Sequence, residues 1–336
     1  MFLSRAFGHL YPRLDFQARK EFFIRKRQSF VKRRKFKRYS DRKLSLRDLA
    51  VLDFLWTWKA ASTGVLTEVA YKDKSQWWIY KALRQLQKEK YIQLLPRGRN
   101  LEIELWALTD LGFEVVLMDR DDIINYRYRP HAPAHDYLAT CLQLGDLWQF
   151  PCDKLFFTEQ MLGSLAPSNF PKGFKNNEGH LPDGITLIRS PLRDVYLGYE
   201  VDLNLKDLQR YKETFIYWEN VQPTLIIWLV RNTWMADKIM GLGKESRHNL
   251  RNGTDILSRV CFILLDDFKE KIWESQVLNG KYKGMTIRKL TANLLQSLSK
   301  ETANFGQKSL KEIFFPKYKS PQKSALYEKL KEKEIY

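Results

Sequence analysis

Residues 181–211 of the chain read LPDGITLIRSPLRDVYLGYEVDLNLKDLQRY, and the architecture of the second half follows from this stretch. Two short apolar runs, 184–188 and 194–200, have the length and composition of strands. Residues 205–218 follow with a helical pattern. Further expected elements of this half are helices at 135–148 and 233–241, a strand and helix within 154–165, and strands at 224–230 and 261–265. Strands that alternate with helices predict an α/β or α+β sheet layer.

Acidic residues stand at the ends of the first two of these strands. Asp183 opens one strand. Glu200, which is 17 residues after Asp183, and Asp202 close the next strand. Because side chains alternate along a strand, Glu200 and Asp202 share a face, and Asp183 can join them from the neighbouring strand. Three converging carboxylates are hard oxygen ligands, so the sequence predicts a site for Mg²⁺ or Mn²⁺ formed by these residues. Such an ion polarises a phosphate and lowers the pKa of bound water.

The arrangement resembles the PD-(D/E)XK nuclease core, in which an Asp, a Glu and a Lys meet at the ends of two strands. Asp202 occupies the position of the motif lysine, so Lys206 or Lys212 on the following helix is expected to supply the cation. As alternatives, Asp183 only shapes a turn after Pro182, or Asp202 caps the following helix. Lys206 is expected in the first turn of that helix, where the dipole disfavours a cation, and this indicates an anionic group nearby.

Residues 44–125 have the pattern of a winged helix-turn-helix domain. The expected elements are a helix capped by Ser45, a short helix at 65–71, a helix capped by Ser75, strands at 91–95 and 101–105, and a closing helix after Thr109-Asp-Leu-Gly112. Leu101, Ile103 and Leu105 alternate with glutamates, which is typical of a strand with one buried face. Three helices followed by a hairpin are the order of a winged helix.

The third helix of this unit is expected to enter the major groove of DNA, with the hairpin tip against the backbone or the minor groove. The expected DNA contacts are Gln76, Trp77, Lys81 and Arg84 on the helix and Arg97 and Arg99 at the tip. Of the adjacent Trp77 and Trp78, one is expected to face the core. Alternatively, these charges only keep the surface soluble, or the domain binds a protein.

The basic charge of the chain is concentrated at its N-terminus. The 336 residues have a net charge of +18, and residues 1–43 contain 15 Lys or Arg against three acids, a net charge of +12. This arm includes Lys32, Arg33, Arg34 and Lys35. A polyanion is the expected partner, since each neutralised phosphate releases counterions. We expect double-stranded DNA, with single-stranded DNA as a further possibility; a solubilising tail and a membrane-surface arm are the alternatives.

The composition excludes several other classes of protein. Hydrophobic residues make up 44% of the chain, but runs such as 225–230 are far shorter than a membrane span, so no membrane insertion is expected. Three cysteines without a CxxC motif argue against a disulfide framework and a cysteine zinc site. We therefore expect a cytoplasmic protein. Residues 291–336 are expected to form a helical, charged tail that is solvated or binds a coupling or replication protein.

The order of these parts resembles the replication-relaxation family, which includes the MobC-type relaxases of mobilizable plasmids. The resemblance covers about residues 45–235 and includes a helix that opens with His135-Asp136, then "PDG", "YEVD" and "PTLIIWLVR". It implies a winged helix for DNA binding and a restriction-endonuclease-like domain, residues 131–290, that nicks one strand. The site residues that it implies are His135, Asp136, Asp183, Glu200, Asp202 and one of Lys206 or Lys212.

Three hypotheses about function follow from these observations. The first is a metal-dependent, relaxase-like DNA endonuclease that nicks one strand at a plasmid or mobile-element origin, in mobilization (conjugation) or replication. The second is a catalytically inactive DNA-binding accessory factor that retains the nuclease fold. The third is a winged-helix transcriptional regulator. Clustered carboxylates with a nearby lysine favour the first, and scattered carboxylates favour the second.

Overall fold

The computed structural model describes residues 44–296, with internal gaps, and Phe314. The segments outside the description are 1–43, 97–100, 102, 119, 121–122, 124–131, 150–153, 166–169, 171–173, 175–179, 189–193, 247–255, 297–313 and 315–336. The basic arm with its Lys32–Lys35 run, the hairpin tip with Arg97 and Arg99, and most of the expected tail lie outside the described residues. Their predicted roles stay predictions.

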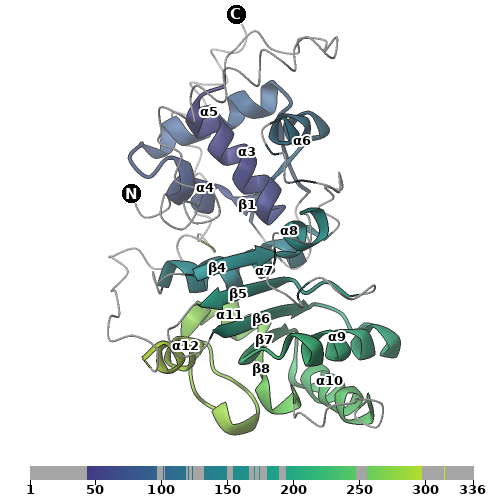
Figure 1. Cartoon of the computed structure of the whole chain (residues 1–336). Helices are drawn as coiled ribbons and strands as arrows, with labels where there is room; N and C mark the ends of the chain where they lie inside the picture. The colour runs from purple at the N-terminus through teal and green to yellow at the C-terminus, as the bar shows by residue number, and fades with distance from the viewer. Residues whose placement is uncertain are drawn as a thin grey trace, which may run out of the picture.

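Residues 44–118 form helices around a small antiparallel sheet (Figure 1). The elements are α3 (Leu46–Trp58), β1 (Ala61–Ser62), α4 (Thr63–Ala70), α5 (Gln76–Lys88), β2 (Ile92–Leu94), β3 (Leu105–Leu108) and α6 (Asp110–Leu117). The strand order is β1-β3-β2. The predicted cap of α3 is confirmed: the Ser45 hydroxyl accepts from the Asp48 N–H, and the Asp48 carboxylate accepts from the Ser45 N–H.

The second strand of the hairpin differs from the prediction. It begins at Leu105 rather than at 101, and all four of its residues are buried. The reason is that β3 is the central strand, paired with β1 on one side and β2 on the other. A central strand buried on both faces reads as an apolar run rather than as an alternation. Leu101 and Ile103 are buried as well, which explains why residues 101–105 have the alternating pattern of a strand.

Thr109 and Gly112 join α6 to the end of β2. The Thr109 hydroxyl accepts from the Gly112 N–H at 3.2 Å and donates to the Tyr91 carbonyl at 3.1 Å. A Cβ on Gly112 would lie 2.0 Å from that same carbonyl oxygen. The Thr-x-x-Gly spacing therefore lets the first turn of α6 pack directly against backbone.

We expect Gly112→Ala to lower the free energy of unfolding by about 1–3 kcal/mol, because the clash is with backbone that cannot rotate away. The matched control is Gly241→Ala, also in a helix, where nothing lies within 4 Å of the new Cβ. This control is expected to be neutral or to stabilise by up to about 1 kcal/mol. Urea unfolding followed by circular dichroism measures both. Equal effects of the two changes would contradict the packing argument.

The second part of the chain contains a mixed five-stranded sheet, so the expected mixture of helices and a mixed sheet is confirmed. Its elements are α7 (Pro133–Gln149), β4 (Lys154–Thr158), α8 (Glu159–Ser164), β5 (Gly184–Ile188), β6 (Val195–Asp202), α9 (Leu208–Val221), β7 (Leu225–Val230), α10 (Thr233–Ser246), β8 (Val260–Leu264), α11 (Leu265–Lys271) and α12 (Ile287–Gln296). The strand order is β4-β5-β6-β7-β8, antiparallel from β4 to β6 and parallel from β6 to β8.

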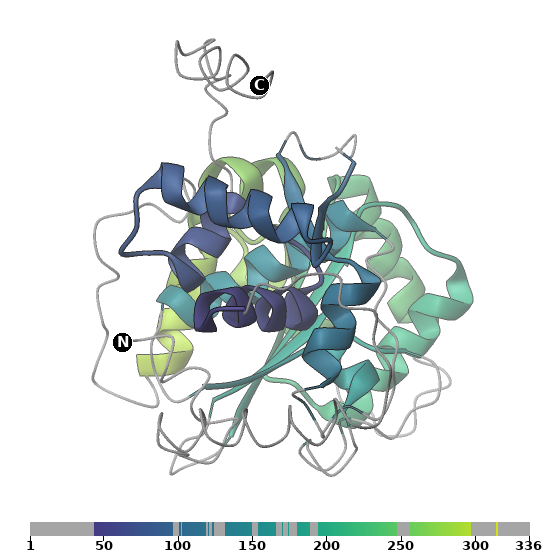
Figure 2. The ribbon, with the colours of Figure 1, turned by 90° about the horizontal axis from the view of Figure 1, so that it is seen from above.

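Two glycines show how helices cover both faces of this sheet. A Cβ on Gly184 of β5 would meet Gln143 of α7, whereas a Cβ on Gly198 of β6 would meet Trp218 of α9. Helices α7 and α9 thus pack on opposite faces, and the absent side chains let them approach closely. Figure 2 shows the strands running between helices on either side. None of the helices in the described parts of the chain is long and apolar enough to cross a membrane.

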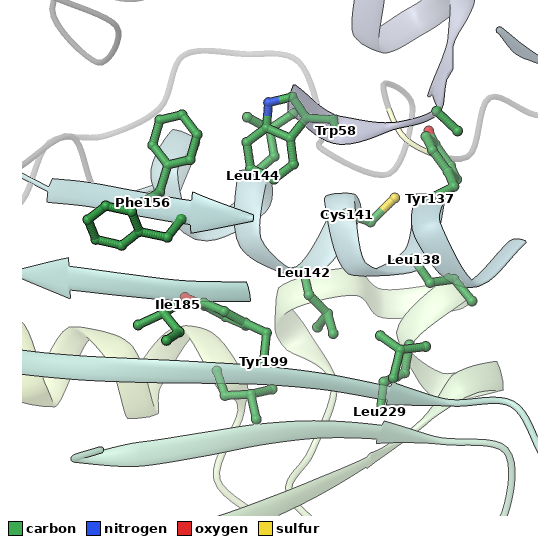
Figure 3. Packing of buried hydrophobic residues seen from close by; sticks show 14 of the residues in the cluster. Trp58, Tyr137, Leu138, Cys141, Leu142, Leu144, Phe156, Ile185, Tyr199 and Leu229 are labelled. Atoms are coloured by element: carbon green, nitrogen blue, oxygen red, sulfur yellow. The ribbon is translucent and has the colours of Figure 1, made fainter. Parts of the chain in front are cut away.

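One continuous hydrophobic core joins the two parts of the chain. The ring of Trp58, at the end of α3, stacks on Phe156 of β4 with centroids 5.3 Å apart. Figure 3 shows Trp58 and Phe156 above the side chains that α7 directs toward the sheet. Phe314 also packs here, stacked on Trp148, while its carbonyl accepts a hydrogen bond from the Tyr137 hydroxyl at 2.6 Å. The first part is therefore docked on the edge of the large sheet.

Candidate functional site

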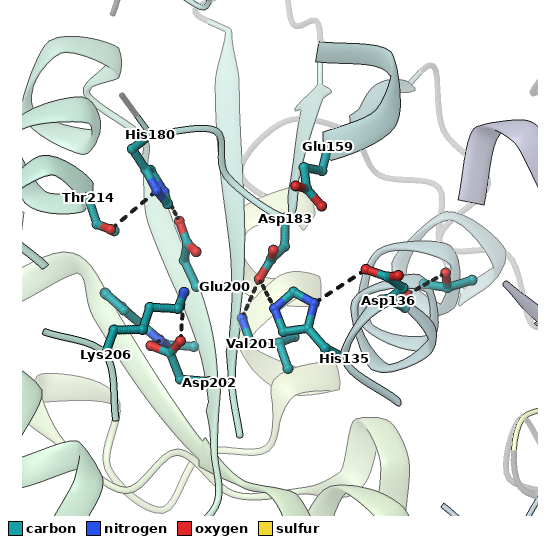
Figure 4. A network of polar contacts seen from close by, with 12 residues as sticks. His135, Asp136, Glu159, His180, Asp183, Glu200, Val201, Asp202, Lys206 and Thr214 are labelled. Atoms are coloured by element: carbon teal, nitrogen blue, oxygen red, sulfur yellow. Dashed lines mark hydrogen bonds and ion pairs between the residues drawn. The ribbon is translucent and has the colours of Figure 1, made fainter. Parts of the chain in front are cut away.

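The antiparallel pairing of β5 with β6 brings the predicted acidic residues together. The start of β5 lies beside the end of β6, and Asp183 immediately precedes β5. Its Oδ2 accepts a hydrogen bond from the backbone N–H of Val201 at 2.6 Å. Figure 4 shows Asp183 directed toward His135, with Glu200 beside His180 and Asp202 beside Lys206. The three acidic residues thus lie at the same end of the β5–β6 pair, and each has different hydrogen-bond or ion-pair partners.

Glu200 and Asp202 point to the same face of β6, the one that α9 covers. Trp218 of α9 donates from its Nε1 to Glu200 Oε1 at 2.9 Å. Trp228 of β7 donates from its Nε1 to Asp202 Oδ2 at 3.0 Å. Both carboxylates are only 1% exposed. Two buried indole donors therefore fix their orientation, since rotating either group away would leave buried polar atoms unpaired.

Lys206 supplies the cation of this cluster. Its Nζ lies 2.7 Å from Asp202 Oδ1. Burial alone would lower the pKa of Lys206, but the negative charges of Asp202, Glu200 and Asp183 outweigh burial and raise this pKa above its usual value. Lys206 is therefore a permanent positive charge that interacts with all three carboxylates.

The start of α9 corrects two expectations about these residues. Asp207 is the N-cap of α9, and its Oδ1 accepts from the Arg210 N–H at 2.8 Å. Asp202 is the last residue of β6 and not a helix cap. Lys206 precedes the helix instead of lying in its first turn, so the dipole argument does not apply to it. Of the two candidate lysines, Lys206 rather than Lys212 makes the ion pair with Asp202.

His180 is a member of the site that the sequence reasoning missed. Its Nε2 lies 2.9 Å from Glu200 Oε1, and its Nδ1 lies 3.4 Å from the Thr214 hydroxyl of α9. Burial alone would lower the pKa of His180, but the Glu200 carboxylate raises it; burial raises the pKa of Glu200 itself. The only available signal was the position of His180 three residues before Asp183.

His135, which the family resemblance implied, lies at the start of α7 between two carboxylates. Its Nε2 is 3.4 Å from Asp183 Oδ2, and its Nδ1 is 3.6 Å from Asp136 Oδ1. The Asp183 charge overcomes burial and raises the pKa of His135 well above its usual value. Conversely, His135 overcomes burial of Asp183 and lowers the pKa of that carboxyl to about 2. Each member of the pair thus favours the charged form of the other.

The polar network continues into the first part of the chain through Lys59, which follows α3. Its Nζ is 3.5 Å from Asp136 Oδ1 and also pairs with Glu159 of α8. Its backbone has φ = 61°, a region that non-glycine residues rarely adopt. A small pocket is lined in part by these three side chains and by Asp183. Asp183 thus links the strand end to the junction between the two parts of the chain.

The three carboxylates, as they are placed, do not fit a divalent cation. Each is already paired with its own basic side chain: Asp183 with His135, Glu200 with His180, and Asp202 with Lys206. Within the described ranges, no three His, Cys, Asp or Glu side chains are grouped so that they could hold a metal ion. Mg²⁺ or Mn²⁺ would first have to displace one of these cations. A metal centre at this position stays a prediction from the sequence.

The predicted DNA-contacting residues of α5 lie on the exposed side of that helix. Gln76, Trp77, Lys81 and Arg84 are all exposed, whereas Ile79, Ala82, Leu83 and Leu86 are buried. The expectation that one of Trp77 and Trp78 faces the core is wrong, because both are exposed. Helical spacing explains this outcome, since Ile79 and not Trp78 begins the buried stripe that continues through Leu83 and Leu86.

Comparison with known proteins gives little further information. No protein-family model and no curated protein matches the chain. One solved structure, titled "Structure of Lactococcus lactis ZitR, C30AH42A mutant", is 23% identical over 32% of this chain and 71% of that one, with a TM-score of 0.19. A TM-score this low does not bear on the fold or on the function of this chain.

Proposed function

We propose that the chain is a DNA-binding protein that acts at the origin of a plasmid or other mobile element, as an accessory factor in replication or mobilization. In this proposal residues 44–125 are a winged helix, residues 131–290 are a restriction-endonuclease-like domain, and DNA binds across α5 and the basic arm. The observation that supports an accessory role is that each of the three carboxylates is paired with its own His or Lys. Such a cluster can hold the domain together without a metal ion.

The arrangement of the first part supports DNA binding. Helices α3, α4 and α5 precede a β2–β3 hairpin, and α5 presents an exposed face that contains Lys81, Arg84 and Lys88. The 13 residues of α5 include no acid. A helix of this kind suits the negative potential of a DNA groove.

A relaxase-like nickase is the second candidate function, and one observation favours it. Lys206 Nζ lies 2.7 Å from Asp202 Oδ1, so a lysine stands beside the acidic residues, as a PD-(D/E)XK nuclease would need, although it comes from a different position than the motif lysine. For nicking, the ion pairs of the resting site would have to open.

One experiment separates the two functions. A supercoiled plasmid that carries the DNA flanking this gene is incubated with wild type, Asp183→Asn or Glu200→Gln, with Mg²⁺, with Mn²⁺ and with a chelator. The accessory role predicts tight, salt-sensitive binding in a gel shift and no open circles in any condition. Metal-dependent open circles, lost in both variants while binding persists, would establish the nickase instead.

The DNA-binding part of the proposal has its own matched pair of variants. Lys81→Gln with Arg84→Gln on α5 is expected to weaken binding by up to about 50-fold at 0.1 M salt, because two phosphate contacts are lost. Arg288→Gln with Lys289→Gln removes the same charge from exposed positions on α12, far from α5 in Figure 1, and is expected to change affinity little. Equal losses in both pairs would show that only net charge matters.

A further inference from the structure

Three aromatic side chains are exposed on the first turns of α5. Trp77, Trp78 and Tyr80 are 54%, 43% and 38% exposed. Seven of the ten tryptophans of the chain are buried, which makes two adjacent exposed indoles unusual for this protein. The core contacts of α5 are made mainly by Ile79, Ala82, Leu83 and Leu86. Of the three exposed rings, Trp78 also lies against buried Tyr71, with ring centres 6.1 Å apart.

Cations surround these rings. Lys81 Nζ lies 5.1 Å from the centre of the Trp77 ring, and Lys74 Nζ lies 5.9 Å from the centre of the Trp78 ring. Arg84 follows Lys81 on the exposed side. The nearest acid at this end of the helix, Asp73, is already paired with Arg47 and Lys74. The surface therefore combines aromatic faces with excess positive charge.

We propose that this aromatic surface, Trp77, Trp78 and Tyr80, binds unpaired DNA bases by stacking. The inference rests on the proposed DNA-binding function and names the form of DNA that α5 binds: a single strand or an opened segment of duplex. In an intact duplex the grooves present base edges and phosphates, and the ring faces are hidden in the stack. An indole has one N–H donor and a broad apolar face, so it gains far more from an unpaired base than from a groove.

The charge pattern supports the same ligand. Proteins that bind single strands combine a positive surface for the phosphates with aromatic rings for successive bases, and loss of one ring weakens binding by about tenfold. Lys74, Lys81 and Arg84 provide that positive surface beside the rings. A protein partner with an apolar patch would need no such concentration of cations.

The test compares variants that keep or remove the aromatic faces. Trp77→Leu with Trp78→Leu retains apolar area but cannot stack, whereas Trp77→Phe with Trp78→Phe retains two rings. Fluorescence anisotropy measures binding to a labelled single strand of about 20 nucleotides and to the duplex of the same sequence. We expect the leucine double variant to bind the single strand about tenfold or more weakly, while its affinity for the duplex changes by less than about threefold. The phenylalanine double variant is expected to retain most of the single-strand affinity of the wild type.

Controls make the outcome decisive. Trp234→Leu removes a similarly exposed indole, 57% exposed, at the start of α10 and is expected to leave the ratio of the two affinities unchanged. Thermal melts confirm that each variant is folded. Equal weakening for both DNA forms, or no weakening for either, would overturn stacking while leaving the proposed function intact. If wild type binds neither DNA, the proposed function itself fails.

Discussion

Replacing Asp146 by alanine is expected to lower the free energy of unfolding by about 3–5 kcal/mol, because the change leaves a buried lysine charge without its partner. Asp146 on α7 is fully buried, and its Oδ2 lies 2.7 Å from Nζ of Lys154 on β4, whose side chain is 2% exposed. The same ammonium group donates to the Asp146 carbonyl at 3.2 Å. This ion pair attaches the edge strand β4 to the central helix of the core.

Two controls distinguish a stranded charge from a general loss of packing. Asp146→Leu together with Lys154→Met removes both charges at similar volume, and much of the lost stability is expected to return. Asp73→Ala breaks the exposed ion pair with Arg47 and is expected to leave the unfolding midpoint almost unchanged. Denaturant unfolding measures all three. A double variant as unstable as Asp146→Ala would contradict the charge argument.

Strands β7 and β8 of the large sheet were predictable because burial makes them apolar over their whole length. The run Leu225–Val230 is buried at every position and contains only apolar residues. Strand ends were less predictable. Expected strand 194–200 continues to Asp202, because pairing with β7 holds the last two residues in the ladder. Pairing of this kind is non-local and leaves no trace in the local pattern.

The candidate site was predictable only where its residues are carried by strands. Glu200 and Asp202 share a face because of strand alternation, and Asp183 joins them because β5 and β6 are antiparallel neighbours. His180 and Lys59 come from segments that no periodicity places. Lys59 is 124 positions before Asp183, and its approach depends on how α3 docks on β4.

The basic side chains around the site give its carboxylates partners that the sequence pattern did not indicate. Clustered carboxylates alone predict a metal ion, since like charges must be neutralised. In the folded chain His135, His180 and Lys206 perform that neutralisation. Histidines far apart in sequence from their carboxylates could not be assigned to them without the fold. The spacing therefore predicted that the acidic residues lie at neighbouring strand ends, but it did not predict their basic partners.

Neutralising Lys32, Arg33, Arg34 and Lys35 to glutamine is expected to weaken duplex DNA binding by up to about 10³-fold at 0.1 M salt. Each lost phosphate contact reduces the slope of log affinity against log salt by about 0.9, so four contacts reduce it by up to about 3.6. Because the counterion term vanishes toward 1 M salt, the difference between variant and wild type should shrink steadily as salt rises. Gel shifts or anisotropy at several salt concentrations measure the slope.

The matched control changes net charge by the same amount in the C-terminal tail. Three of the four lysines at 323, 329, 331 and 333 lie within two residues of a glutamate, so their local potential is weak. Their replacement by glutamine is expected to leave the slope nearly unchanged. Equal slopes in the two variants would mean that net charge alone attracts DNA. An unchanged slope in the N-terminal variant would show that the run makes no phosphate contacts, which would place DNA binding on residues 44–125 alone.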